Sequence, residues 1–141
     1  MIGVVLDVNV LISGLISQSG PPYKILDAWL NQRFTLFVSP QILQEIEHVL
    51  IYPRIRARIT DAQIIAFVSH LSNKALVTSG ELQINVLTND SSDNKFLACA
   101  IEAKAEYLVT GNLVHFAEAG QKYSGIEICS PRKFLEVLDN L

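Results

Sequence analysis

Short runs of apolar residues alternate along this chain with longer segments in which apolar residues recur every three or four positions. Short apolar runs are typical of strands buried on both faces of a parallel sheet, and the periodic segments are typical of amphipathic helices. Strands are expected at residues 2–6, 34–38, 106–109 and 126–129, with further candidates at 75–78 and 84–87. Helices are expected at residues 8–17, 21–32, 40–51, 61–73 and 93–104, and from residue 131 to the end of the chain.

Capping signals indicate where several of these helices begin. Ser39 and Ser130 each precede a proline, which places a serine at the N-cap and a proline in the first turn of the helix. Thr60 precedes the fourth predicted helix, and either Ser91 or Ser92 is expected to cap the fifth. Strands that alternate with helices through short connections predict an α/β fold with a central parallel sheet.

The length and composition favour one compact domain. The chain has 141 residues, enough for one ordinary domain spanning residues 1–141, and half of them are apolar, which excludes a disordered chain. No apolar run approaches the roughly 20 residues of a membrane span. The first residues lack the basic region of a signal peptide and are predicted to form a strand, so a cytoplasmic location is expected.

The charge balance argues against a protein that holds nucleic acid by bulk attraction alone. Eleven Lys and Arg residues stand against 14 Asp and Glu residues, for a net charge of −3. The densest basic group is Arg54, Arg56 and Arg58, which is suited either to RNA phosphate contacts or to an ordinary solvated surface. The two cysteines, Cys99 and Cys129, fit neither a disulfide framework nor a zinc motif and are predicted to be reduced.

Acidic and amide residues fall where an open α/β sheet places its ligands, outside the carboxyl ends of the strands. Asp7 ends the first predicted strand and Asn112 follows the strand at 106–109, although a strand-ending Asp is also a common helix N-cap. On a helical wheel Asp93 points along the apolar face of its helix, toward the rest of the fold. The alternative is that Asp93 is simply a first-turn acid favoured by the helix dipole.

The helix predicted at 40–51 carries two further candidates, Glu45 and Glu47, which lie about 100° to either side of the centre of its apolar stripe. Periodicity leaves the choice between them open. Carboxylates that converge on one sheet edge repel one another, and a divalent ion such as Mg²⁺ or Mn²⁺ is the natural counter-charge. The three histidines are interpreted as surface or polar-contact residues rather than as metal ligands: His48, His70 and His115.

Four segments resemble, in order, the sequence motifs of PIN-domain nucleases. They are residues 5–13 (VLDVNVLIS), 39–46, 90–100 and 107–112, the last ending in Thr-Gly-Asn. Their order and spacing match across nearly the whole chain. The match is nearest to the PIN-family toxins of bacterial toxin–antitoxin pairs, which include VapC-like toxins.

The resemblance implies a three-layer α/β/α fold, with a central parallel sheet flanked by helices, and cleavage of RNA phosphodiesters with bound Mg²⁺ or Mn²⁺. It selects Glu45 over Glu47, because Glu45 occupies the motif position. The catalytic metal ligands that it implies are Asp7, Glu45 and Asp93, with Asn112 as a further metal position. The supporting polar residues that it implies are Asn9, Asp90 and Thr110. By the same resemblance, the partners are an RNA substrate and an antitoxin protein, and the chain forms a homodimer.

One position departs from the family pattern. The fourth motif commonly carries an Asp where this chain has Asn112, which offers a metal a carbonyl oxygen but no charge. Three acids remain, so a second metal ion would be held more weakly. This departure motivates an alternative function, a PIN-fold module that binds RNA or protein with little catalysis. A phosphatase of the haloacid-dehalogenase type fits less well, because Asn9 stands where its second acid would be and the chain is short for that fold.

Overall fold

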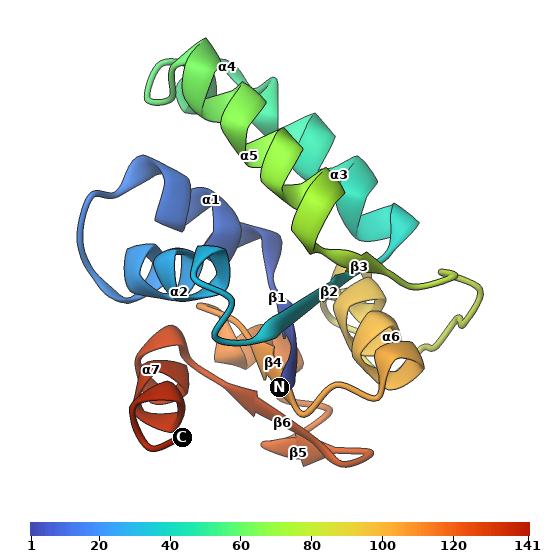
Figure 1. Ribbon diagram of the computed structural model, residues 1–141. Helices are drawn as coiled ribbons and strands as arrows, with labels where there is room; N and C mark the ends of the chain where they lie inside the picture. The colour runs from blue at the N-terminus through green and yellow to red at the C-terminus, as the bar shows by residue number, and fades with distance from the viewer.

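The computed structural model describes all 141 residues and shows a six-stranded sheet with helices against both faces (Figure 1). The strands are β1 (Gly3–Leu6), β2 (Thr35–Val38), β3 (Leu76–Val77), β4 (Tyr107–Val109), β5 (Lys122–Tyr123) and β6 (Ile126–Cys129). The α-helices are α1 (Val8–Ile16), α2 (Pro21–Leu30), α3 (Pro40–Leu50), α4 (Pro53–Arg56), α5 (Asp61–Lys74), α6 (Asn94–Ala103) and α7 (Pro131–Asp139). Two 3₁₀ turns are η1 (Ser91–Asp93) and η2 (Leu113–Phe116).

The strand order is β3-β2-β1-β4-β6-β5, so β1 lies in the middle of the sheet between β2 and β4. All neighbouring strands are parallel except β5, which runs antiparallel to β6 at the edge. Leu6 at the end of β1 is in register with Val109 at the end of β4. The residues that follow these two strands therefore emerge side by side at the carboxyl edge of the sheet.

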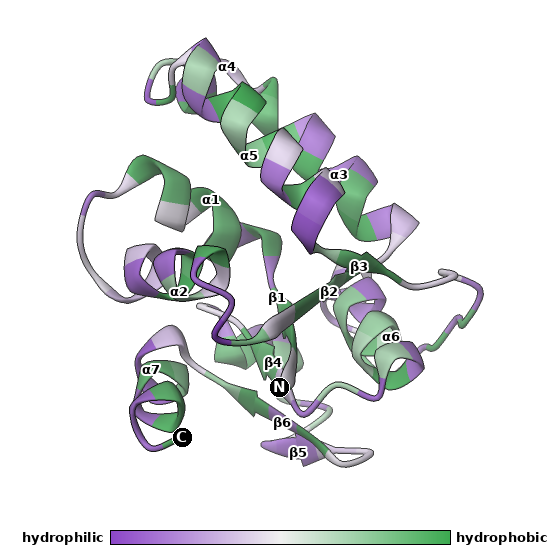
Figure 2. Ribbon diagram, in the orientation of Figure 1, coloured by the Kyte–Doolittle hydropathy of each residue, from purple (hydrophilic) through white to green (hydrophobic).

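Helices cover both faces of the sheet and its carboxyl edge. In Figure 1, α2 and α7 lie to one side of the central strands and α6 lies to the other, while α3, α4 and α5 extend beyond the carboxyl ends of the strands. All four residues of β1 are buried, as expected for a central strand covered on both faces. In Figure 2, α1 and β6 are mostly hydrophobic, whereas α3 and α5 alternate in hydropathy, as helices with one solvent-exposed face do.

The predicted capping signals form as expected at three helices. The Ser39 hydroxyl accepts a hydrogen bond from the backbone N–H of Ile42 at the start of α3. The Thr60 and Gln63 side chains form a reciprocal capping box at α5. The Ser130 hydroxyl accepts from the backbone N–H of the third residue of α7. These contacts satisfy N–H groups that would otherwise lack partners within the helix.

The segment before α6 differs from the prediction. Residues 84–87 form no strand, because the buried Asn94 side chain accepts hydrogen bonds from the backbone N–H groups of Val86 and Leu87 in place of a neighbouring strand. Neither Ser91 nor Ser92 caps α6, since both belong to η1 and the N-cap position falls on Asp93. The two-residue strand β5 and the one-turn helix α4 were not predicted, because segments this short carry no periodicity.

The two cysteines are free and buried. Burial raises the pKa of the Cys99 thiol to about 11 and that of the Cys129 thiol to about 12, so both are protonated near neutral pH. None of the helices combines the length and the apolar character that crossing a membrane requires.

Candidate functional site

Asp7 and Thr110 meet at the carboxyl edge of the sheet, immediately after β1 and β4. The backbone N–H of Asp7 donates to the carbonyl oxygen of Val109 at 2.9 Å, which continues the pairing of the two strands by one residue. The Thr110 hydroxyl then donates to Asp7 Oδ2 at 2.8 Å. The sheet register alone therefore brings together two residues that are 103 positions apart in the sequence.

Asp7 is almost completely buried, with 3% of its surface exposed. Its Oδ1 atom accepts a hydrogen bond from the backbone N–H of Asn9, so Asp7 caps α1, as one of the two interpretations of this residue predicted. Burial raises the pKa of the Asp7 carboxyl, the hydrogen bond from Thr110 opposes the rise, and the charge of Glu45 adds to it. A buried carboxylate near a second acid is stabilised by a cation.

Asp93 points into the same region from the start of α6, and its side chain is only 15% exposed. Its Oδ2 atom lies 3.0 Å from Nδ1 of His115. Burial raises the pKa of Asp93, the negative charge of Asp7 raises it further, and the contact with His115 lowers it. Asp7 and Asp93 are thus close enough to repel each other across the carboxyl edge of the sheet.

Glu45 faces this acidic region and Glu47 does not. Glu45 is half-buried on α3, and its charge raises the pKa of both Asp7 and Asp93, whereas Glu47 is exposed to solvent. Glu45 Oε1 forms an ion pair of 2.6 Å with Lys95 Nζ on α6. The tertiary structure thus resolves the choice between two glutamates that the helical wheel left open.

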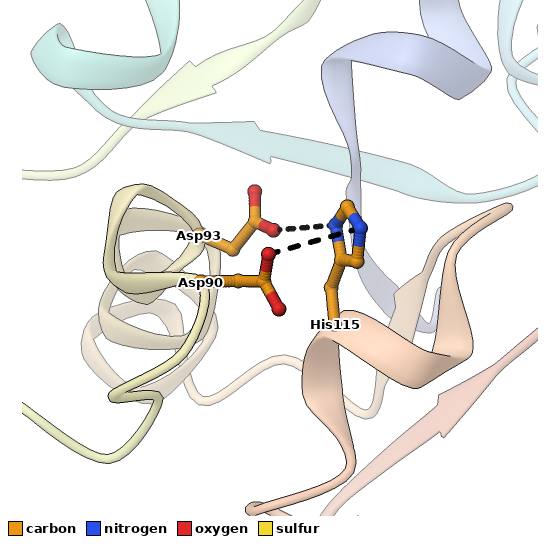
Figure 3. Close-up of side chains that lie close together, drawn as sticks. All are labelled: Asp90, Asp93 and His115. Carbon is orange, nitrogen blue, oxygen red and sulfur yellow. Dashed lines mark hydrogen bonds and ion pairs between the residues drawn. The ribbon is translucent and has the colours of Figure 1, made fainter.

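His115 is also part of this cluster. From the sequence, this histidine was interpreted only as a surface or polar-contact residue. Figure 3 shows the carboxylates of Asp93 and Asp90 on the same side of its ring: Nδ1 faces Asp93, and Nε2 lies 3.8 Å from Oδ1 of Asp90. One ligand atom from each of these three residues lies within 4.8 Å of the others. His115 stands three residues after Asn112, a spacing that a 3₁₀ helix such as η2 places on one side, but no pattern in the sequence indicates η2.

Asn112 contacts a residue of this site, whereas the predicted basic residues do not. The backbone N–H of Asn112 donates to the Thr110 hydroxyl at 3.0 Å, while its side chain makes no hydrogen bond within the protein. Arg54, Arg56 and Arg58 lie on α4 and the turn after it and form no contact with the acids. Arg56 pairs instead with Asp61 at the exposed start of α5.

The donor set fits a hard divalent cation. The charges of Asp7, Glu45 and Asp93 act on one another, and the one ammonium group in direct contact with this set is that of Lys95. Burial is the main reason that the pKa values of the two aspartates are raised, and a buried carboxylate is stabilised by a cation. Carboxylate oxygens suit Mg²⁺ or Mn²⁺, and the imidazole of His115 adds a nitrogen donor that favours Mn²⁺ over Mg²⁺.

Comparisons with known proteins agree with this fold. The family model of the PIN domain matches residues 3–114. The uncharacterized protein MJ1680 of Methanocaldococcus jannaschii is 32% identical over 142 residues, which cover 96% of this chain and 90% of that protein. The fold is similar to a chain in the crystal structure of VapBC2 from Rickettsia felis bound to a promoter DNA fragment, with a TM-score of 0.59 and 14% identity. That alignment covers 91% of this chain and 98% of the other.

Proposed function

The chain belongs to the PIN-domain family, and on that premise we propose that it is an Mg²⁺- or Mn²⁺-dependent endoribonuclease that hydrolyses RNA phosphodiesters. The observation that carries the proposal is the convergence of Asp7, Glu45 and Asp93 from β1, α3 and α6 at the carboxyl edge of the sheet. PIN domains are generally nucleases, so the family and the acidic set point to the same chemistry.

In this proposal, Asp7, Glu45 and Asp93 hold the metal, with Asp90, His115 and Asn112 at the margin of the site. A divalent ion bound there supplies Lewis acidity toward the phosphate and lowers the pKa of a water. The chain's own residues fix the ligands: Thr110 orients the Asp7 carboxylate, and His115 orients that of Asp93. Loss of a hydrogen bond that holds a metal ligand in place typically lowers metal affinity or activity about 10–100-fold.

We further propose that the chain is the toxin of a toxin–antitoxin pair and works in the cytoplasm as a homodimer of single domains spanning residues 1–141. The fold similarity to a chain of the VapBC2 structure, which also contains promoter DNA, supports an antitoxin partner. The partner would silence cleavage by covering or distorting the acidic edge. This part of the proposal is tested with the protein encoded by a neighbouring reading frame. That protein is expected to co-purify with this chain and to inhibit its cleavage of RNA.

The experiment that tests the nuclease proposal incubates the purified protein with mixed structured and single-stranded RNA in Mg²⁺, in Mn²⁺ and in EDTA. Cleavage is expected with either metal and is expected to stop in EDTA. Asp7→Asn removes one negative charge from the metal ligands while keeping the side-chain shape, and it is expected to abolish cleavage. Asp27→Asn is the matched control, because Asp27 is an exposed residue of α2. Metal-independent cleavage, or full activity in Asp7→Asn, would refute the proposal.

A second candidate function is an RNA- or protein-binding PIN module with little catalysis, which the neutral Asn112 favours. Asn112→Asp adds a charge near the acids, so it is expected to tighten metal binding and to lower the melting temperature of the metal-free protein. The melting temperature is measured first without metal. Mn²⁺ binding and the rate of RNA cleavage are then measured across an Mn²⁺ titration for the natural protein and the variant. An inert natural protein beside an active Asn112→Asp variant would establish the binding module instead.

A further inference from the structure

The ammonium group of Lys95 is fixed in place beside the acids of the candidate site. Lys95 is the second residue of α6, and its Nζ atom lies 2.6 Å from Oε1 of Glu45 on α3. The same ammonium donates a hydrogen bond of 2.7 Å to the carbonyl oxygen of Ser92. Only 21% of the Lys95 side chain is exposed, whereas most lysine side chains extend into solvent. The two contacts therefore position this charge within the site.

The two aspartates of the set have no cationic partner of this kind. Neither Asp7 nor Asp93 forms an ion pair with a lysine or an arginine. Glu45 is thus the one acid of the three that is paired with an ammonium. The charge of Glu45 also acts on both aspartates, since it raises the pKa of each. Lys95 consequently compensates the carboxylate whose charge both aspartates sense.

A divalent ion that takes Glu45 as a ligand meets this ammonium. A bond from Mg²⁺ to a carboxylate oxygen is about 2.0–2.1 Å long, so the ion would lie within a few ångströms of an ammonium that contacts the same carboxylate. Two positive charges this close repel each other strongly where solvent screening is weak. The ion pair between Lys95 and Glu45 must therefore open before a metal ion can use Glu45 fully.

The other contacts of Lys95 make this opening possible. The Ser92 carbonyl accepts its hydrogen bond independently of Glu45, so the ammonium keeps one partner when the carboxylate leaves. The Nζ atom also lies 5.5 Å from the centroid of the Phe96 ring, within the range of a cation–π contact. Release of Glu45 therefore removes only one of the contacts that hold the ammonium.

We propose that Lys95 is a tethered cation that competes with the divalent ion for Glu45 and thereby sets the metal affinity of the site. While Lys95 pairs with Glu45, the three acids repel one another less, and a metal ion displaces the ammonium as it binds. In this role Lys95 determines affinity without being a metal ligand. The assignment rests on the proposed metal-dependent nuclease function and adds a residue that sets its metal requirement.

The first test measures Mn²⁺ binding by isothermal titration calorimetry. Lys95→Gln removes the competing cation, so Kd for Mn²⁺ is expected to fall about tenfold, which corresponds to one charge-assisted hydrogen bond. If Lys95 served only to fasten α6 to α3, its loss would loosen the metal ligands and raise Kd. Weaker or unchanged Mn²⁺ binding by folded Lys95→Gln would overturn the proposal.

A double-mutant cycle determines whether Lys95 acts through Glu45. Glu45→Gln removes the carboxylate for which the two cations compete, so adding Lys95→Gln to it is expected to change Kd for Mn²⁺ by no more than about twofold. A general repulsion between Lys95 and the metal ion would instead tighten binding equally in both backgrounds. Additive effects of the two substitutions would therefore overturn the competition for Glu45.

Control variants separate the effect of this charge from changes in folding and net charge. Lys95→Arg keeps a positive charge and is expected to keep Kd within about threefold of the natural protein. Lys104→Gln removes a charge from the exposed residue that follows α6 and is expected to change Kd by less than about twofold, because solvent screens a distant charge. Thermal melting shows which variants fold. If Lys95→Gln does not fold, Lys95→Met, which also lacks the charge, replaces it.

Metal binding and RNA cleavage give separate answers. If Mn²⁺ binds and supports cleavage but Lys95→Gln and Glu45→Gln act additively, only the competition is overturned. If the two positions are coupled while no metal supports cleavage, the competition is upheld and the nuclease function fails. If neither the natural protein nor any Lys95 variant binds Mn²⁺, both proposals are overturned.

Discussion

At the scale of single residues, each acid of the candidate site has a partner that fixes its direction. Thr110 holds Asp7, His115 holds Asp93, and Lys95 pairs with Glu45. Each partner lies on a different segment from the acid that it contacts. Lys95, the partner of Glu45 on α3, lies at the start of α6 close in sequence to Asp93. These tertiary contacts therefore hold the acids of the site in position. Removal of the partner of Asp7 or of Asp93 is expected to weaken metal binding or RNA cleavage by a measurable amount.

His115→Ala tests whether this histidine supports the metal site. The variant loses the 3.0 Å contact with Asp93 and one candidate nitrogen ligand, so Mn²⁺ binding is expected to weaken about 10–100-fold, as for loss of other ligand-holding residues. Isothermal titration calorimetry with Mn²⁺ and with Mg²⁺ measures the effect, which should be larger for Mn²⁺. His70→Ala is the control. Unchanged affinity for both metals would show that the contact with Asp93 is structural only.

Glu45→Gln and Glu47→Gln test the assignment of the two glutamates. Glu45→Gln removes a charge that faces Asp7 and Asp93, so it is expected to reduce RNA cleavage at least tenfold, whereas Glu47→Gln alters a solvent-exposed group and is expected to change cleavage by less than twofold. Initial rates at saturating metal provide the comparison. A greater loss from Glu47→Gln would place the catalytic face of α3 on its other side.

At the scale of elements, the segment from residue 78 to residue 90 has no regular structure and is held by side chains. The Glu102 carboxylate accepts hydrogen bonds from the Ser79 hydroxyl and from the backbone N–H groups of Gly80 and Leu82. At the other end, the Glu118 carboxylate binds the backbone N–H of Thr88. The segment ends at Asp90, so these two glutamates help to set the position of the acidic edge.

The attachment of this segment is expected to depend on pH. The hydrogen bond from Ser79 lowers the pKa of Glu102 below its ordinary 4.5, and the bond from Thr88 does the same for Glu118. An acid with a lowered folded-state pKa stabilises the structure above its ordinary pKa, and this stabilisation is lost as the pH falls through the lowered value. Hydrogen-exchange protection of the Gly80 and Leu82 amides should therefore be present at pH 6 and decline below about pH 4.5.

Glu102→Gln is expected to reduce that protection already at pH 6 and to remove much of its pH dependence. Glu81→Gln is the control, because the Glu81 side chain accepts no hydrogen bond within the segment. If Glu102→Gln kept the full protection and the same pH profile, the segment would have to be held by its packing rather than by this carboxylate.

At the scale of the whole molecule, the last helix lies outside the matched family region but within the same core. The family match ends at residue 114, whereas α7 packs the fully buried Phe134 edge-on against Phe34, with ring centroids 5.3 Å apart. Arg33 also donates to the carbonyl oxygen of Leu138 at 2.8 Å. These contacts support the proposal that residues 1–141 form one domain.

Phe134→Ala is expected to lower the free energy of unfolding by about 3–5 kcal/mol, the usual loss for a buried Phe. Chemical denaturation should remain a single cooperative transition that shifts as a whole, because α7 and the sheet share one core. Ile65→Ala, at a position 69% exposed on α5, is expected to change stability by no more than about 0.5 kcal/mol. Separate unfolding of α7, with the rest of the protein unchanged, would contradict a single domain.

Features that depend on local order along the chain could be predicted from the amino-acid sequence. Five of the six predicted strands and all six predicted helices form within a few residues of their predicted limits, because apolar periodicity and capping residues act over short distances. The positions of Asp7 and Asp93 at the ends of elements were also readable, since a strand end and a helix start are local features.

Which side chains contact one another depends instead on the tertiary structure. Glu45 and Glu47 are equivalent on a helical wheel, and the packing of α3 over the carboxyl edge distinguishes them. His115 is isolated in the sequence but lies beside Asp93, because the register of β4 with β1 and the turn η2 bring it there. The Asn94 bonds that replaced the strand expected at 84–87 are likewise side-chain contacts. Such contacts depend on the packing of whole elements, which periodicity along one segment does not encode.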